Sequence, residues 1–195
     1  MSDWERLSLC VAGHSAAGKT FASEMFAEIL GGEVLCVDEI ENDLICRHPL
    51  VFKRIYGVYP SNVDFACEIR RNGTWQQEFD LVSNLLPLIN YRIGKQIKHR
   101  KQYTIINGCD AAATQWWHEG VLVTSTLPLR SRAYNKRRGF KDLNRAQGIL
   151  LQREIAHSPT VKLAQSAKYK LFNTFDATLC KQVEEVCEDV LSIKR

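Results

Sequence analysis

The residues best suited to chemistry form one short run near the start of the chain. Residues 13–20 read Gly-His-Ser-Ala-Ala-Gly-Lys-Thr, which fits the phosphate-binding pattern G-x-x-x-x-G-K-[ST]. The two glycines permit backbone angles in which successive N–H groups turn inward around an anion. A Lys at this spacing reaches the β- and γ-phosphates of ATP, and the Thr hydroxyl coordinates Mg²⁺. The run therefore predicts an ATP and Mg²⁺ site, with Lys19 also catalytic, built from Gly13, His14, Ser15, Ala16, Ala17, Gly18, Lys19 and Thr20.

The segments on either side of this run are those that such a loop needs. Residues 7–12 form a short apolar run typical of a buried strand, and the apolar residues over 21–30 recur at helical spacing. Gly31 and Gly32 then end the helix, and residues 34–37 indicate a second strand. This order opens an α/β fold with a central, mainly parallel sheet. The alternative, a Gly-rich turn without a ligand, does not explain a Lys-Thr pair at this spacing.

Two acidic residues follow expected strands. Asp38 ends the second strand, at the edge where ligands bind in open α/β sheets. A carboxylate there could take a proton from an attacking hydroxyl or hold Mg²⁺ through water, and the equal alternative is that it caps a helix from Glu39 onward. Asp110, after a third strand over 103–106, leaves the same choice between a metal carboxylate and a helix cap.

Two basic clusters lie in the second half of the chain. The first has five cations in nine residues: Arg130, Arg132, Lys136, Arg137 and Arg138. Like charges at this density repel one another without an anionic partner, which favours a mobile lid over phosphates; the alternative is a solvated basic face. We expect Arg132 and Arg137 to be the catalytic lid cations. The second cluster, over residues 92–101, is expected to be a solvated helix end.

The rest of the chain completes one three-layer domain over residues 1–195. Helical spacing covers residues 77–97, where Pro87 is expected to kink or split the helix, and also 130–138, 144–155 and 179–190. Further strands are expected at 121–124 and 169–172. No repeat, low-complexity segment or linker divides the chain.

Composition excludes several classes of protein. The chain has 195 residues, 45% of them hydrophobic and 25% charged, which are globular values. The formal net charge of +4 suits an anionic substrate such as a nucleotide and does not require nucleic acid. No apolar run reaches the roughly 18 residues of a membrane helix and no signal peptide is apparent, so we expect no membrane and a cytoplasmic location. Seven cysteines without a CxxC pair argue against zinc and disulfide frameworks.

Beyond the phosphate-binding run, the sequence resembles the dephospho-CoA kinase family, a nucleoside-monophosphate-kinase-like group of P-loop kinases. The segments similar to the family's motifs are Asp38-Glu39-Ile40 (D-A-D), residues 48–57 (P-A-L-x-x-I-x-x-x-F-G), 72–77 (D-G-x-L-x-R), 84–89 (L-x-H-P-x-I), 121–137 (strand and lid) and 167–173 (A-D-x-V-I-x-N). The resemblance implies a three-layer P-loop kinase fold, an acceptor-binding helical region at about 40–100 and a helical lid at about 128–166. It also implies Asp38 as the base, Gln152 as the lid glutamine and Asn173 beside the adenine.

The departures from the family fall mostly on the acceptor side. Gln77 stands where the family has Arg, Leu86 where it has His, and residues 107–110 replace its P-L-L-x-E. The resemblance therefore implies an ATP-dependent kinase with a nucleotide-like acceptor more strongly than it implies dephospho-CoA. The alternatives are a diverged (deoxy)nucleotide kinase, a kinase of a modified base in DNA or of polynucleotides, a non-kinase P-loop nucleotide-binding module and an inactive binder. A switch GTPase is disfavoured, because the chain has no NKxD-like motif.

Overall fold

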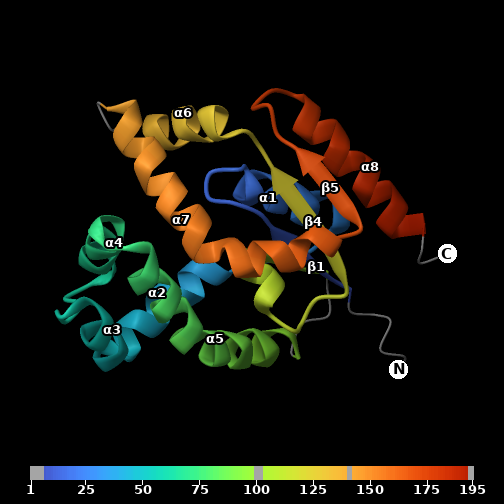
Figure 1. Ribbon diagram of the computed structural model, residues 1–195. Helices are drawn as coiled ribbons and strands as arrows, with labels where there is room; N and C mark the ends of the chain where they lie inside the picture. The colour runs from blue at the N-terminus through green and yellow to red at the C-terminus, as the bar shows by residue number, and fades with distance from the viewer. Residues whose placement is uncertain (1–6, 99–102, 140–141, 193–195) are drawn as a thin grey trace.

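The fold is organised around a five-stranded parallel sheet (Figure 1). The computed structural model describes residues 7–98, 103–139 and 142–192. The strands follow the spatial order β2-β3-β1-β4-β5, and every neighbouring pair is parallel. Their bounds are β1 (Ser8–Ala12), β2 (Glu33–Cys36), β3 (Thr104–Asn107), β4 (Glu119–Thr124) and β5 (Tyr169–Phe172). The carboxyl ends of the strands therefore meet at one edge of the sheet.

Helices cover both faces of the sheet and extend beyond one side of it (Figure 1). They are α1 (Lys19–Leu30), α2 (Val37–Arg47), α3 (Pro49–Tyr56), α4 (Val63–Asn72), α5 (Trp75–Ile97), α6 (Leu127–Arg138), α7 (Leu143–Leu163) and α8 (Thr178–Ser192), with 3₁₀ turns η2 (Ala111–Ala113) and η3 (Ala164–Ser166). Alternate residues of β1 enter different cores. Leu9 and Val11 pack with α1 and α8, whereas Cys10 and Ala12 pack with α2, α5 and the end of α7. The predicted three-layer α/β fold is confirmed.

Several element boundaries differ from the expected ones. Helix α2 begins at Val37, so Asp38 lies inside its first turn and does not cap it. Pro87 lies within one continuous helix, α5, and so does not split it. That helix starts at a capping box in which Thr74 accepts from the Gln77 N–H and the Gln77 side chain accepts from the Thr74 N–H. Helices α6 and α7 are both longer than the periodicity predicts.

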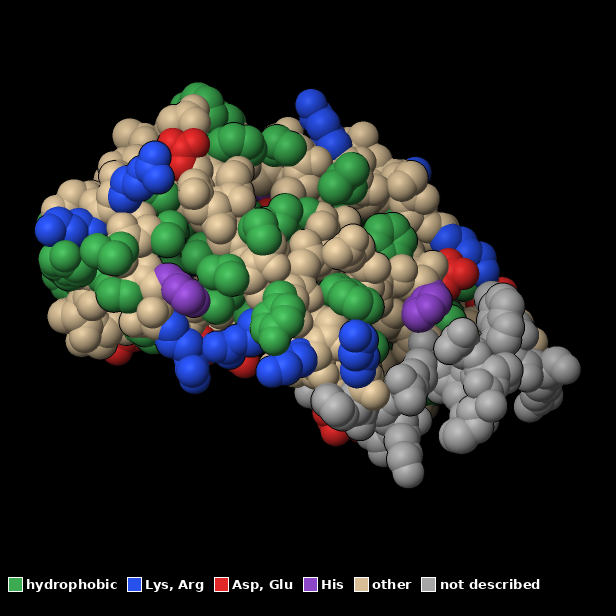
Figure 2. Space-filling view, turned by 90° about the horizontal axis from the view of Figure 1, so that it is seen from below, with side chains coloured by type: hydrophobic (Ala, Val, Ile, Leu, Met, Phe, Trp, Pro, Cys, Tyr) green, Lys and Arg blue, Asp and Glu red, His purple; other side chains and the backbone are tan. Residues whose placement is uncertain are grey.

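The basic stretch over residues 92–101 lies in and after the last turns of α5. Figure 2 views the molecule from the side of α3 and α5, where basic side chains lie among apolar ones. Arg92 Nη1 is 2.7 Å from Asp43 Oδ2, and the Lys95 ammonium lies 5.5 Å from the centre of the Tyr91 ring. Residues 99–101 fall outside the described part of the chain. Within the described ranges, no helix has the length and apolar character needed to cross a membrane.

A buried chain of charged side chains joins the helices that extend beyond the sheet. Arg70 of α4 donates to Glu41 Oε1 of α2 over 3.2 Å and to Glu78 Oε1 of α5 over 2.6 Å. His157 of α7 lies 3.6 Å from Glu78 Oε1 and 2.9 Å from Asp110 Oδ2. All five side chains are at most 8% exposed. The chain of alternating charges therefore holds α2, α4, α5 and α7 in one arrangement.

The order of charges sets the protonation state of each group. Burial opposes ionisation of Glu78, but Arg70 and His157 hold the pKa of Glu78 well below its usual range. Burial also opposes the charge on His157, yet Asp110 raises the pKa of His157 well above its usual value. Glu41 lies at the end of the chain with one cationic partner, and burial raises its pKa to about 7. Glu41 is therefore the member of the chain that titrates near neutral pH.

This raised pKa predicts a decline of stability between about pH 5 and 6, below the range in which the raised pKa of His157 adds to the decline. The folded protein keeps a proton on Glu41 up to about pH 7, whereas the unfolded chain loses it near the ordinary value of 4.5. Stability therefore falls as pH rises through this window, by at most about 1.4 kcal/mol per pH unit for one proton. Glu41→Gln should flatten the decline, measured by urea unfolding across the window. Glu39→Gln, exposed on the same helix, should retain it, and an unchanged slope in Glu41→Gln would contradict the raised pKa.

Candidate nucleotide-binding site

The phosphate-binding run forms the loop between β1 and α1, as the pattern predicts. Gly13, Ala16 and Gly18 have φ angles of 145°, 61° and 102°, in the region that favours glycine. Space also requires glycine, because a Cβ on Gly13 would lie 2.1 Å from Val123 O and one on Gly18 would lie 2.2 Å from Asn173 Nδ2. The loop is therefore confined between β4 and the end of β5, at the N-terminus of α1, where helix geometry favours an anion.

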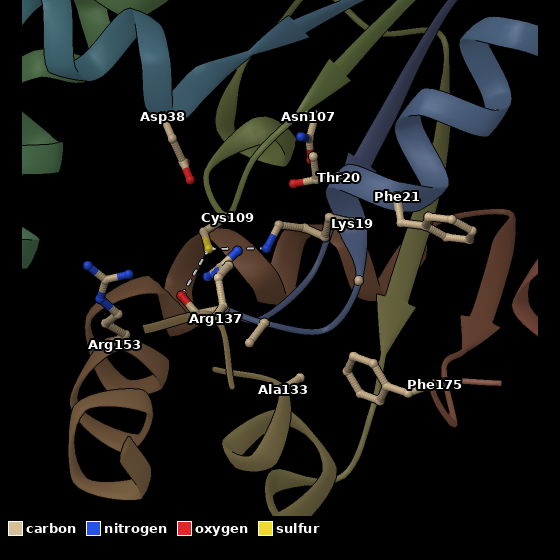
Figure 3. A pocket seen from close by; sticks show the side chains of 13 residues that line it. Lys19, Thr20, Phe21, Asp38, Asn107, Cys109, Ala133, Arg137, Arg153 and Phe175 are labelled. Atoms are coloured by element: carbon tan, nitrogen blue, oxygen red, sulfur yellow. Dashed lines mark hydrogen bonds between the residues drawn. The ribbon is translucent and has the colours of Figure 1, made fainter. Parts of the chain in front are cut away.

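A cavity of about 240 Å³ opens above this loop at the carboxyl edge of the sheet (Figure 3). One wall comes from the loop and from the start of α1: Ser15, Ala16, Gly18, Lys19, Thr20 and Phe21. The opposite walls come from five other segments: Asp38, Asn107, Cys109, Ala133, Arg137, Arg153 and Phe175. The cavity thus gathers side chains that are up to 160 positions apart in the sequence, from residue 15 to residue 175.

Lys19 lies at the centre of this arrangement. It is the first residue of α1 and only 8% exposed. Its Nζ donates to His14 O over 3.0 Å and to Cys109 Sγ over 3.4 Å. Among the residues that the structure describes, no carboxylate forms an ion pair with it. The ammonium charge is therefore directed into the cavity and available to a phosphate.

Asp38 and two arginines lie across the cavity from the loop. Figure 3 shows Arg137 of α6 extending toward Lys19, and Arg153 of α7 on the same side of the cavity as Asp38. Burial and the neighbouring Arg138 lower the pKa of Arg137, so an anion in the cavity would stabilise its charge. Sequence reasoning predicted Asp38 and Arg137 but missed Arg153. The sequence indicates Arg153 only weakly, because it is a single arginine that lies three residues from a buried apolar position of a largely polar helix.

Oxygen atoms suited to Mg²⁺ lie beside Thr20. Asn107, at the end of β3, is 3% exposed, and its Oδ1 has no hydrogen-bond donor among the described residues. A buried acceptor without a donor is costly, which indicates that a ligand meets it. Mg²⁺ keeps several waters and binds few protein oxygens together with substrate phosphates. The oxygens of Thr20, Asn107 and Asp38 therefore fit Mg²⁺, although no three His, Cys, Asp or Glu of the described ranges could hold a metal by themselves.

Several predicted site residues support the loop without lining the cavity. Asn173 is buried, its Nδ2 donates to Ala17 O over 3.0 Å, and its Oδ1 accepts from the Phe175 N–H over 2.7 Å. It therefore holds the loop from behind and orients Phe175, which does line the cavity. The remaining predicted loop residues outside the cavity wall are Gly13, His14 and Ala17.

Two expectations need correction. Arg132 is exposed and absent from the cavity wall, whereas Ala133 and Arg137, one turn apart on α6, both line it. One residue turns a helix by about 100°, so Arg132 lies off the face that Arg137 occupies. Asp110 is not a cavity carboxylate, and although it occupies the N-cap position of η2 its side chain does not cap the turn, because it is buried against His157 and accepts from Thr160 Oγ1 over 2.7 Å.

Arg130 has a different role from the other lid arginines. It is 3% exposed and donates to Ser15 O of the loop over 3.4 Å, to Ser125 O over 3.2 Å and to Glu154 Oε2 over 2.7 Å. The other oxygen of Glu154 lies 3.7 Å from His14 Nε2. Arg130 and Glu154 therefore clamp the loop to both α6 and α7.

Comparisons with known proteins agree with this architecture. No family model and no curated protein matches the sequence. Among solved structures, TT1252 from Thermus thermophilus has a TM-score of 0.68 at 18% identity, over 96% of this chain and 97% of that one. Shikimate kinase from Bacteroides thetaiotaomicron has a TM-score of 0.55 at 14% identity, over 96% and 97%. Dephospho-CoA kinase from Campylobacter jejuni has a TM-score of 0.53 at 16% identity, over 95% and 98%.

These matches, the parallel sheet and the loop at its carboxyl edge establish that the chain has the P-loop kinase fold. The likeness extends over nearly the whole chain and over nearly the whole of each matching structure. At such identities it establishes the fold alone. Which molecule the site accepts must be argued from the side chains of this chain.

The clamp predicts that Arg130 is needed for nucleotide binding although it does not line the cavity. Arg130→Gln removes a charged bond of about 1.5–3 kcal/mol that holds Ser15 and Glu154, so ADP affinity should fall roughly tenfold or more. Lys136→Gln, which removes an exposed charge from the same helix, serves as the matched control. Calorimetric titration measures both. Equal ADP affinity in the two variants would show that the loop keeps its shape without the Arg130 guanidinium.

Proposed function

We propose that this protein is an ATP- and Mg²⁺-dependent kinase that transfers the γ-phosphoryl group to a nucleotide-like acceptor. The observation that carries the proposal is the cavity itself, which places Lys19 and Thr20 of the P-loop opposite Asp38, Arg137 and Arg153. Phosphoryl transfer requires little covalent chemistry from a protein and depends on positioning and charge neutralisation. These five side chains can supply both.

Each side chain has a distinct part in this proposal. Lys19 binds the β- and γ-phosphate oxygens, and Arg137 contacts the transferred group from the lid. Asp38 orients the acceptor hydroxyl or phosphate and takes its proton where one must leave. Thr20, Asn107 and Asp38 would hold Mg²⁺, which when bound neutralises charge on the phosphate oxygens. The resemblance places the acceptor in the region of about residues 40–100 and the lid at about 128–166, and both assignments are part of the proposal.

The charges around the cavity favour an acceptor that is itself an anion. Arg70 lies on the acceptor side, but Glu41 and Glu78 already neutralise it. Arg153 lines both the main cavity and a narrow depression beside the α4–α5 junction, where Arg71 also lies. Neither Arg71 nor Arg153 forms an ion pair within the described ranges. A phosphate or carboxylate on the acceptor would supply the missing negative charge.

The acceptor itself is not identified by the resemblance to dephospho-CoA kinases. Gln77 stands at a position where that family has Arg, and its side chain is used in the α5 cap and donates to Ile55 O over 3.1 Å. A polynucleotide acceptor is less favoured, because two cations of the basic stretch have partners within the protein: Arg92 is paired with Asp43, and Lys95 lies over Tyr91.

The decisive experiment combines an acceptor panel with the loss of Lys19. Labelled ATP is incubated with dephospho-CoA, ribo- and deoxyribonucleotides, shikimate and single-stranded DNA. One acidic nucleotide-like acceptor should be phosphorylated, and Lys19→Ala should reduce its rate by on the order of 10²–10³-fold, the cost of removing one donor to developing charge. ADP binding without transfer to any acceptor would favour the non-kinase module. Near-normal transfer by Lys19→Ala would refute the proposal.

Asp38 is tested by separating the two kinetic constants. If Asp38 takes the acceptor's proton, Asp38→Asn should lower kcat by on the order of 10²–10⁴-fold, the usual contribution of a positioned base. If Asp38 only binds the acceptor, KM should rise while kcat is kept. Glu39→Gln, exposed and next in the sequence, is the control and should change neither constant.

A further inference from the structure

Cys109 places a sulfur atom against the P-loop lysine. Its Sγ lies 3.4 Å from Lys19 Nζ and 3.5 Å from Ser15 Oγ, as the dashed lines in Figure 3 show. The residue is 6% exposed, and its sulfur faces the cavity. All seven cysteines lie within the described residues, and Cys109 is the one that lines this cavity. Its thiol is thus reached through the nucleotide site.

The surroundings of this sulfur are those of a reactive cysteine. The nucleophile is the thiolate, and reactive cysteines lie beside Lys or protonated His in sites open to small molecules. Lys19 donates directly to Sγ, and the cavity beside the sulfur admits a small molecule. Cys10 and Cys187, the other two buried cysteines, do not line the cavity.

A second observation indicates that a small polar ligand fits this wall. Asn107, two residues before Cys109, lines the same cavity and is 3% exposed. Its Oδ1 has no donor within the described ranges. Mg²⁺ would satisfy this oxygen when nucleotide is bound. In the free protein an O–H donor on the cavity side would satisfy it, and both a water molecule and a hydroperoxide carry such a group.

We propose that Cys109 is a peroxide-sensitive site whose oxidation prevents nucleotide binding. The sulfur attacks one oxygen of a hydroperoxide, so that an S–O bond forms as the O–O bond breaks. The second oxygen leaves with the electron pair and takes up a proton as water or an alcohol. The sulfur loses two electrons and becomes a sulfenic acid, which two molecules of a thiol reductant return to the thiol with release of water.

Oxidation and nucleotide binding exclude each other because both use Lys19. In the structure the ammonium of Lys19 is shared between His14 O and the sulfur, whereas a bound triphosphate requires it on the phosphate oxygens. An oxygen added to Sγ lies on the cavity side, beside Lys19, in the space that the phosphates need. Conversely, bound phosphates withdraw Lys19 and cover the sulfur. The inference rests on nucleotide binding at the P-loop and does not require phosphoryl transfer.

The test treats the reduced full chain with hydrogen peroxide in the presence and absence of ADP. Dimedone traps sulfenic acid, peptide mass spectrometry locates it, and calorimetry measures ADP affinity after peroxide is removed. Dimedone should label Cys109, and ADP at ten times its Kd should slow the labelling roughly tenfold, since only free protein reacts. ADP affinity should fall by about tenfold or more and recover with dithiothreitol.

Two variants separate this site from general oxidation. Cys109→Ser, whatever its starting affinity, should lose no further ADP affinity on peroxide treatment. Cys46→Ser removes an exposed thiol of α2 and should behave as the unchanged chain. An equal loss of affinity in Cys109→Ser, or Cys109 labelling that ADP does not slow, would overturn the proposal. A reduced protein that binds ADP but phosphorylates no acceptor would refute the kinase and leave this proposal standing.

Discussion

The parallel pairing of the strands is the constraint on which the site depends. Cys36, at the end of β2, is in register with Asn107 of β3, and Asn107 is in register with Val11 of β1. Whatever follows each strand must therefore emerge at the same edge. The P-loop follows β1, Asp38 follows β2 and Cys109 follows β3, so three segments far apart in sequence meet without any direct interaction between Asp38 and the loop. A slip of one residue would turn each strand's side chains to the opposite face of the sheet.

Charge is distributed differently in the two halves of the molecule. From Arg70 to Asp110 the buried chain alternates in sign with two cations and two anions, and Glu41 keeps its proton up to about pH 7. Each ion therefore has an opposite neighbour in a medium where an isolated charge is very costly. Around the cavity the cations outnumber the anions, with Lys19, Arg137 and Arg153 facing Asp38. The balanced chain stabilises the arrangement of the helices by itself. The charges around the cavity are balanced only when an anion binds. This is the difference expected between a cluster that stabilises the fold and a cluster that binds a ligand.

The sequence predicted those parts of the site that are local in the chain. The P-loop is one continuous pattern, and Asp38 is placed by the strand before it, so both were found. Arg132 and Arg137 could not be told apart from composition, because helical phase relative to α7 decides which one faces the cavity. Asn107 and Cys109 lie directly after an expected strand, and attention to every strand end would have found them. The pairing of Asp110 with His157 joins residues that are 47 positions apart. No local pattern in either segment predicts this pair.

The Arg130 clamp limits how the proposed lid could move. Glu154 lies on α7 and moves together with Arg130, so a lid that swings as a whole would have to break the two bonds from the Arg130 guanidinium to Ser15 O and Ser125 O, and losing hydrogen bonds from a buried charged group is costly. Motion that keeps these bonds is confined to the stretch of chain between Arg130 and Glu154, which includes Arg137 and Arg153. The two arginines that line the cavity thus lie on the part of the proposed lid that these bonds leave free, while Arg130 holds its base to the P-loop. Closure over phosphates would then move Arg137 and Arg153 and leave the P-loop unchanged.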